Sequence, residues 1–307
     1  MADTPLIRLG TRQSPLAMAQ AHETRARLCA AHGWDEAAVE LVPVIASGDR
    51  IQDRPLAEIG GKALWTRELD IWLAEGRIDA AVHSMKDVET LRPETLTIAA
   101  ILPRADKADR LLGADSIADL PEGATIGTSA PRRVAQLLHH RPDCRVVSLR
   151  GNVATRMSKL QAGECDATFL AAAGLDRLGE IDTGVRLDPD EWLPAPAQGA
   201  IGIECRTDNE EAREWLSAID HAQSHAEIAL ERAFLEGLGG SCSSPIALIC
   251  EPCGDVFSMR AKIFSPDGKH FRKGESRPPK GYLQQARNFA KLLLRYSPPE
   301  ITEHFDK

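Results

Sequence analysis

The sequence lacks the features that mark membrane, secreted and nucleic-acid-binding proteins. No apolar run reaches the roughly 20 residues that a transmembrane helix needs. Residues 1–5 have neither the basic nor the apolar region of a secretory signal. The 307 residues carry a formal net charge of −8, which argues against a general affinity for nucleic acid or acidic lipid. We therefore expect no nucleic-acid or membrane partner, and any anion site must be a local basic cluster.

A disulfide framework is also lacking, because the seven cysteines are an odd number and are widely spread. This pattern fits a reducing compartment, so we expect a cytoplasmic protein. Cys250 and Cys253 have redox or metal spacing, but no second pair or fitting histidine accompanies them, so we predict no metal site. Cys242 lies in a loop rich in glycine and serine, where an exposed thiol is a candidate for covalent chemistry.

Strand and helix patterns alternate along most of the chain, which predicts mostly parallel sheets of the α/β class. Strands are expected at 6–10, 39–46, 81–88, 96–102, 124–127, 145–149, 166–171 and 200–205, and helices at 15–33, 64–75, 130–139 and 152–161. From about residue 220 a long helix (222–238), three strands (246–249, 257–264 and 270–275) and a final helix (281–296) predict a small α+β domain.

Two stiff crossings, at 103–106 and 193–199, divide the α/β part. Strand 200–205 could rejoin the first sheet. We therefore predict domain 1 at 1–103 with 199–219, domain 2 at 104–198, and domain 3 at 220–307. A hinge with a cleft between the first two domains follows from the two crossings.

The first helix has strong boundary signals and basic residues ahead of it. Ser14 is a preferred N-cap, and Pro15 suits the first helical position. Gly33 is a natural stop. Arg8 lies inside the first strand and Arg12 just before the helix, where an anion would be held. The alternative is two surface arginines.

Asp87 follows a short apolar run and lies in a dense polar cluster. Parallel sheets bind ligands at the carboxyl ends of their strands. One carboxylate near many arginines suggests an anionic ligand with acid–base work at its centre. The alternative is that Asp87 caps a helix or pairs with Lys86.

Two later helix starts carry arginines where the helix dipole disfavours cations by about 0.3–1 kcal/mol each. Arg132 and Arg133 fall in the first turn of one helix, and Arg150 and Arg156 flank the start of the next. A bound polyanion would explain both, whereas solvated arginines are the simpler alternative. Arg177 is a weaker member of this set.

Residues 60–62 (Gly-Gly-Lys) fail as a phosphate loop. Leu56 stands where the first glycine should be, and Ala63 where Ser or Thr should bind magnesium. A loop that closes over a site with Lys62 is the better interpretation.

Several long motifs resemble the porphobilinogen deaminase (hydroxymethylbilane synthase) family over nearly the whole chain. They are residues 10–16 (Gly-Thr-Arg-Gln-Ser-Pro-Leu), 82–88 (Val-His-Ser-Met-Lys-Asp-Val), 127–129 with 132–133, 149–153 with 155–156, 173–175, 198–200, and the Cys242 loop before residues 245–246. The resemblance implies two domains like type II periplasmic binding proteins and a third that bears a cofactor.

The resemblance also implies a function and a set of roles. The enzyme would join four porphobilinogen units head to tail into hydroxymethylbilane with loss of ammonia, in tetrapyrrole and haem biosynthesis. Cys242 would carry a dipyrromethane cofactor through a thioether, and Asp87 would be the catalytic carboxylate. The substrate and cofactor carboxylates would be held by a set of polar residues: Arg8, Arg12, Ser14, Lys86, Ser129, Arg132, Arg133, Arg150, Arg156, Arg177 and Gln198. We expect a monomer.

Arginine suits this ligand because each porphobilinogen brings two carboxylates, and a guanidinium donates to a carboxylate with two parallel bonds. The chain departs from the family pattern at Glu58, Glu89 and Lys107, and has Gly-Ser-Cys at 240–242 in place of Gly-Gly-Cys. None of these changes removes a group that the chemistry needs. The rival hypothesis is a non-catalytic solute-binding protein, which explains the hinge and the arginines but not Cys242 or the third domain.

Overall fold

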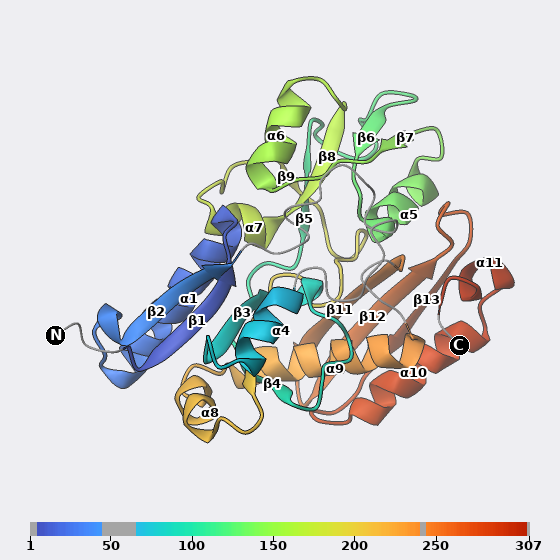
Figure 1. The fold of residues 1–307 in the computed structure, drawn as a ribbon. Coiled ribbons are helices and arrows are strands. Elements are labelled where there is room, and N and C mark those ends of the chain that lie inside the picture. Colours follow the sequence, from blue (N-terminus) through green and yellow to red (C-terminus); the bar gives the residue numbers. More distant parts are fainter. Residues whose placement is uncertain (1–4, 45–65, 240–243, 306–307) are drawn as a thin grey trace. The chain divides into compact units, whose positions relative to one another are not determined.

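The computed structural model describes residues 5–44, 66–239 and 244–305. They form two compact units (Figure 1). The first comprises Met1–Ala105 with Ala200–His225, and the second comprises Asp106–Gly199 with Ala226–Lys307.

The first unit contains a five-stranded sheet in the order β2-β1-β3-β10-β4, of which Figure 1 labels β2, β1, β3 and β4. Its strands are β1 (Ile7–Arg12), β2 (Val39–Val44), β3 (Ala80–Ser84), β4 (Leu96–Ile101) and β10 (Ile201–Arg206). β1 pairs in parallel with β2 and β3, whereas β10 runs antiparallel to both β3 and β4. The prediction that the chain returns to the first sheet after residue 200 is confirmed, and the returning strand fills an interior position.

Helix α1 (Pro15–His32) shows how local signals set its boundaries. The Ser14 Oγ accepts a hydrogen bond from the Ala17 N–H at 3.3 Å, and Gly33 ends the helix in the left-handed conformation at φ 66°, as predicted. The first unit also contains α4 (Arg67–Ala74), α8 (Glu210–Ser217) and the short 3-10 helices η1 (Glu36–Ala38) and η2 (Met85–Asp87). Leu28 of α1 and Leu216 of α8 pack with Ile7 and Ile203 of the sheet in one buried core.

The second unit begins with another five-stranded sheet, in the order β7-β6-β8-β5-β9. Its strands are β5 (Asp109–Leu112), β6 (Thr125–Gly127), β7 (Arg145–Val147), β8 (Ala167–Ala171) and β9 (Val185–Arg186). β7, β6 and β8 are parallel, and β5 is antiparallel to β8. β5 and β9 were not predicted, whereas the parallel part was.

Three helices accompany this sheet: α5 (Pro131–His140), α6 (Val153–Gln161) and α7 (Ala172–Arg177). Their N-caps differ, and the expectation that Thr128 and Ser129 cap the helix beginning at Ala130 is wrong. The Asn152 side chain caps α6 by accepting the Thr155 N–H at 2.9 Å. The N-cap of α5 is Ala130, not Thr128 or Ser129, because the Thr128 Oγ1 accepts the Ala130 N–H outside the helix.

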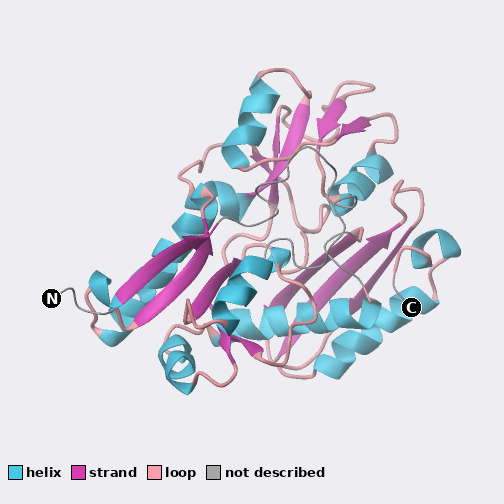
Figure 2. Cartoon of the chain, viewed as in Figure 1, coloured by secondary structure: helices cyan, strands magenta, loops and turns pink. Residues whose placement is uncertain are grey.

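The last part of the second unit is an antiparallel sheet of β11 (Ile246–Cys253), β12 (Val256–Phe264) and β13 (Phe271–Ser276). Helices α9 (Ala222–Leu238) and α10 (Leu283–Arg295) lie against it, and the short α11 (Pro299–Thr302) follows (Figures 1 and 2). Phe234, Leu248, Met259 and Phe289 join the helices and the sheet in one buried core. The predicted α+β character of this region is confirmed.

A small core joins α5 to the C-terminal sheet of the second unit. Ala135 of α5 and Leu193 pack with Ala247, Ile249 and Phe264 of the C-terminal sheet. In the described part of the chain, the helices are too short or too polar to cross a membrane.

Candidate active site

Asp87 lies where the chain leaves the first sheet. β3 ends at Ser84, and Asp87 is the last residue of η2. The Met85 N–H donates to the Ala200 carbonyl at 3.1 Å, which ties the start of η2 to the strand returning through β10. Asp87 is half-buried, and its carboxylate has no hydrogen-bond or ion-pair partner among the described residues. It is therefore available to a ligand, and the alternative of an internal pair with Lys86 is not what the structure contains.

A buried charge network follows Asp87 in the same unit, and the sequence did not predict it. Arg92 donates to Glu204 through Nε at 2.9 Å and Nη2 at 2.7 Å. The same guanidinium contacts Asp70 at 2.5 Å and Glu89 at 2.8 Å. A carboxylate inside the apolar strand Ile201–Arg206 was the signal for such a partner, since buried carboxylates are paired.

Burial and charge act in opposite directions on the pKa values of this network. Burial raises the pKa of the Glu204 carboxyl, but contacts with His83 and Arg92 outweigh it and lower the pKa to about 2. The His83 Nε2 lies 3.3 Å from the Glu204 Oε2 without meeting hydrogen-bond geometry. The pKa of Asp70 is raised, chiefly by its burial. Glu204 is therefore charged across the neutral range.

The basic residues of the first sheet differ in their surroundings. Arg8 forms a two-pronged ion pair with Asp79, at 3.0 and 2.8 Å, and also donates to the Gly76 carbonyl. The hydrogen bonds to the Asp79 carboxylate raise the pKa of Arg8. Arg8 thus has an internal partner, and its predicted contact with a ligand carboxylate stays a prediction. Arg12 ends β1, is half-buried, and precedes the cap residue Ser14.

Arg132 and Arg133 share one buried carboxylate, that of Asp109 at the start of β5. The Nη2 atoms of both arginines lie 2.7 Å from it. The Asp109 carboxylate also accepts from the Trp192 Nε1 and the Gln198 Nε2, each at 2.9 Å. Burial raises the pKa of Asp109, but the charges of both arginines outweigh it and hold the pKa far below its usual range.

This arrangement changes the explanation for two of the arginines. The sequence argument required an external anion because Arg132 and Arg133 are in the first turn of α5. Asp109 supplies that negative charge from inside the protein, on a strand that was not predicted. Gln198 belongs to the same network, and its role in ligand binding likewise stays a prediction.

Ser129 and Arg150 follow the carboxyl ends of two strands at one sheet edge. Ser129 comes after β6 and Arg150 after β7, whereas Arg177 is the last residue of α7, the helix that follows β8. Because β7, β6 and β8 are parallel, these ends meet at the same edge. The Ser129 Oγ lies 2.9 Å from the Ser148 Oγ, and the Arg177 Nη2 donates to the Gly199 carbonyl at 3.1 Å.

Arg156 joins this edge from the first turn of α6. Its Nε donates to the Gly151 carbonyl at 2.9 Å, in the turn between Arg150 and the helix. Gly151 has φ 114°, a conformation that favours glycine. The basic residues Arg150 and Arg156 are therefore presented from a fixed turn at a helix N-terminus, where an anionic group is favoured.

Two predicted residues, Lys62 and Cys242, lie outside the described residues, as does Glu58. Cys250 is buried and Cys253 is exposed. The described ranges hold no group of three or more His, Cys, Asp or Glu side chains that could bind a metal ion.

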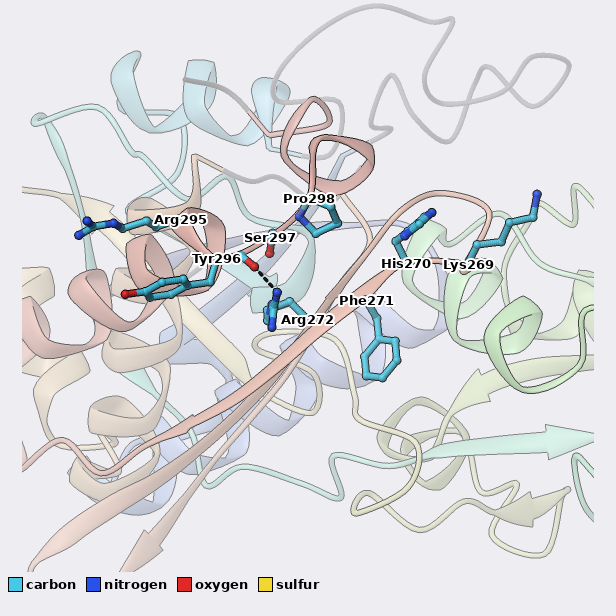
Figure 3. Close-up of a pocket in the computed structure, with 8 residues that line it drawn as sticks. All are labelled: Lys269, His270, Phe271, Arg272, Arg295, Tyr296, Ser297 and Pro298. Atoms are coloured by element: carbon cyan, nitrogen blue, oxygen red, sulfur yellow. Dashed lines mark hydrogen bonds between the residues drawn. The ribbon is translucent and has the colours of Figure 1, made fainter.

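A surface hollow between the end of α10 and the start of β13 is separate from these residues (Figure 3). Arg272 donates to the Tyr296 carbonyl there, which satisfies the C-terminal end of α10. Lys269 and Arg295 point away from one another in Figure 3. The cations do not converge on one point, so we assign the hollow no ligand.

Comparison with known proteins assigns both parts of the chain to one family. Residues 7–214 match the family described as "Porphobilinogen deaminase, dipyromethane cofactor binding domain", and residues 225–294 match "Porphobilinogen deaminase, C-terminal domain". The chain belongs to the porphobilinogen deaminase family. Asp87 and the arginines at the edge of the second sheet all lie within the first matched range.

Curated members of the family are similar over most of their length. The porphobilinogen deaminase of Sphingopyxis alaskensis is 58% identical over 87% of this chain and 86% of its own length. That of Paracoccus denitrificans is 51% identical, over 85% of each. The chloroplastic enzyme of Oryza sativa is 49% identical, over 87% of this chain and 76% of its own length.

Solved structures give weaker similarities. A Bordetella pertussis BvgS VFT2 domain is 17% identical with a TM-score of 0.42, covering 76% of this chain and 94% of that one. The Salmonella typhimurium periplasmic binding protein STM4351 is 12% identical with a TM-score of 0.40, covering 70% and 92%.

Proposed function

We propose that the chain joins four porphobilinogen units head to tail into hydroxymethylbilane, with release of ammonia at each step, in tetrapyrrole biosynthesis. The observation that carries this proposal is the family match over residues 7–214, which contains the half-buried Asp87 and the basic sheet edge. A dipyrromethane group joined to Cys242 by a thioether is the primer, and supplies the pyrrole to which the first unit is added. We include a cytoplasmic location and a monomeric state in the proposal.

Asp87 carries the acid–base work. In each step a C–N bond of porphobilinogen breaks, ammonia leaves, and a new C–C bond forms with the pyrrole at the end of the chain, which then loses a proton. The Asp87 carboxyl group donates a proton to the leaving amine. As a carboxylate it stabilises the positive charge that develops on the methylene carbon and its pyrrole ring. Its half-burial strengthens that interaction relative to water.

The basic residues hold the acetate and propionate groups. The donor set at the edge of the second sheet fits a carboxylate-bearing cofactor, because Ser129, Arg150 and Arg156 follow parallel strands or begin a helix. Arg12, Ser14 and Lys86 serve the incoming unit near Asp87, with Lys62 added from its loop. Arg177 completes the set.

Arg132 and Arg133 have a different place in the proposal. Both already donate to Asp109 and are almost fully buried. A direct bond from either to a cofactor carboxylate requires that this arrangement opens. We therefore propose that Arg150 and Arg156 are the main residues that bind the cofactor carboxylates.

The test uses Cys242→Ser and Asp87→Asn. Cys242→Ser should give folded protein without a dipyrromethane adduct by intact mass, and with negligible turnover. Asp87→Asn should carry the adduct but turn over at least ~10²-fold more slowly, which is the scale of losing a general acid. An active Cys242→Ser protein, or wild-type protein without an adduct, would contradict the proposal and favour a non-catalytic solute-binding protein.

A further inference from the structure

The segment that carries Asp87 is fixed at both ends. Upstream, β3 is held between β1 and β10 in the sheet. Downstream, Arg92 is joined by two hydrogen bonds to Glu204 of β10, at 2.9 and 2.7 Å. Since β10 pairs directly with β3, both ends of the segment are tied to adjacent strands of one sheet. Asp87 lies between them.

Glu89 provides a second attachment, only two residues beyond Asp87. Its Oε2 accepts from the Thr66 Oγ1 at 2.9 Å and from the Arg92 Nη1 at 2.8 Å. Thr66 is the residue that precedes α4. The intervening Val88 is buried at 8% exposure, and its N–H donates to the Met85 carbonyl at 3.3 Å. The peptide that follows Asp87 is therefore constrained by packing and by hydrogen bonds on either side.

The Arg92 guanidinium is a rigid anchor rather than a surface ion pair. Its side chain is 8% exposed, and Nε, Nη1 and Nη2 each donate to a carboxylate. Burial lowers the pKa of Arg92, but hydrogen bonds to Glu204 and Asp70 outweigh it and raise the pKa above its usual value. A guanidinium held in this way stays charged and has one geometry.

We propose that Glu89 and Arg92 are positioning residues that hold Asp87 in its working geometry. The proposal rests on the proposed catalytic role of Asp87. A displacement of about 1 Å can cost an enzyme as much as 10²-fold in rate, so an anchor two residues from the reacting carboxylate is expected to act on turnover. The competing explanation is that the network only stabilises the first unit.

Glu89 is a better residue to substitute than Glu204. Its side chain is 24% exposed, whereas Glu204 is fully buried, so its removal is the milder change. Glu89→Ala removes the hydrogen bonds from Thr66 and Arg92. Glu89→Gln keeps an oxygen that can accept from Thr66 and Arg92, and serves as the conservative rescue. Glu36→Ala is the matched control, because Glu36 forms a 2.9 Å pair with Arg25 in the same unit but has no contact with the network.

Turnover is measured per folded, cofactor-loaded molecule, with loading determined by intact mass. Glu89→Ala should lower kcat at least ~10-fold with KM within about threefold of wild type. This pattern is expected when a substitution weakens stabilisation of the transition state but not substrate binding. Glu89→Gln and Glu36→Ala should stay within about threefold in kcat. In an Asp87→Asn background, Glu89→Ala should cost less than about twofold more, because residues that act as one unit are not additive.

Three outcomes would overturn the positioning role. One is a Glu89→Ala enzyme with normal kcat once it is loaded and folded. Another is equal loss from Glu89→Gln and Glu89→Ala. The third is a full additional loss from Glu89→Ala in the Asp87→Asn background, which would mean that Glu89 acts by another route. If Asp87→Asn alone turns over normally, the proposed role of Asp87 fails instead, and the two failures are thereby distinguished.

Discussion

Replacing Asp109 is the strongest single test of what stabilises the second unit. It is fully buried and accepts from Arg132, Arg133, Trp192 and Gln198 at 2.7–3.2 Å. Asp109→Asn keeps the shape but removes the charge, and it turns an NH₂ group toward N–H donors. Among the described residues, two buried guanidinium groups then lose the one carboxylate that they share.

The expected cost follows from the burial of these groups. Removing one partner of a buried ion pair costs about 3–5 kcal/mol, and here two cations depend on one anion. We expect the free energy of unfolding to fall by at least ~4 kcal/mol, a large part of the 5–15 kcal/mol that holds a typical domain together. With a urea m-value of about 1–3 kcal/mol/M, the unfolding midpoint of the second unit should fall by more than about 1 M.

Substitutions of Arg132 and Arg133 should lower the free energy of unfolding by different amounts. Arg133 donates through Nε, Nη1 and Nη2, two of these bonds going to Asp109 and one to the Phe169 carbonyl. Arg132 donates one bond to Asp109 and one to Leu193, and its Nε has no partner in the described part of the chain. Arg133→Met should therefore destabilise more than Arg132→Met, and both less than Asp109→Asn.

The pH dependence gives an independent check. Because the folded-state pKa of Asp109 lies far below its ordinary value of 3.8, the carboxylate contributes its full stability above that value. The contribution is lost progressively as pH falls below about 4, where the unfolded chain binds the proton first. Asp109→Asn should lack this part of the acid sensitivity. An Asn variant that unfolds at the wild-type urea concentration, with unchanged acid sensitivity, would refute the reasoning.

Lys107→Met and Glu227→Gln should each destabilise by about 2–4 kcal/mol, and the double variant by less than their sum, because the pair is 2.8 Å apart and largely buried; additive urea midpoints would contradict this. Arg156→Leu should keep the cofactor but accumulate partly elongated adducts by mass spectrometry after brief exposure to porphobilinogen, whereas a wild-type ladder would exclude the role. Gly113→Ala should destabilise by at least ~1–3 kcal/mol, since Gly113 has φ 99° and a Cβ there would lie 2.2 Å from the Asp166 carbonyl oxygen; an unchanged thermal midpoint would show that the backbone adjusts.

Features of the fold encoded by neighbouring residues could be predicted from the sequence. Ser14, Pro15 and Gly33 set the ends of α1 because capping depends on the few residues around each end. β5 and β9, with four and two residues, were not predicted. β5 pairs with β8 and β9 pairs with β5, so each of them depends on a partner strand that is distant in sequence.

The candidate site was likewise predicted only in part. The motifs correctly predicted that Asp87 and the arginines lie near strand ends and helix starts, because these positions depend on residues that are close together in the sequence. The partners of Arg132 and Arg8 could not be read, because Asp109 and Asp79 are 23 and 71 residues away in sequence. A single sequence does not reveal whether such an arginine awaits a ligand or already has a carboxylate inside the protein.

The position of β10 has a consequence for the order in which the protein is made. β10 separates β3 from β4, yet it is synthesised about 100 residues after β4. Until residues 201–206 leave the ribosome, β3 and β4 have unpaired inner edges, and exposed edges favour pairing with other chains. The first unit, although it contains the N-terminus, thus finishes folding only after the α/β part of the second has been synthesised. Fragments that stop before residue 200 would lack an interior strand of their sheet and the buried partner of Arg92.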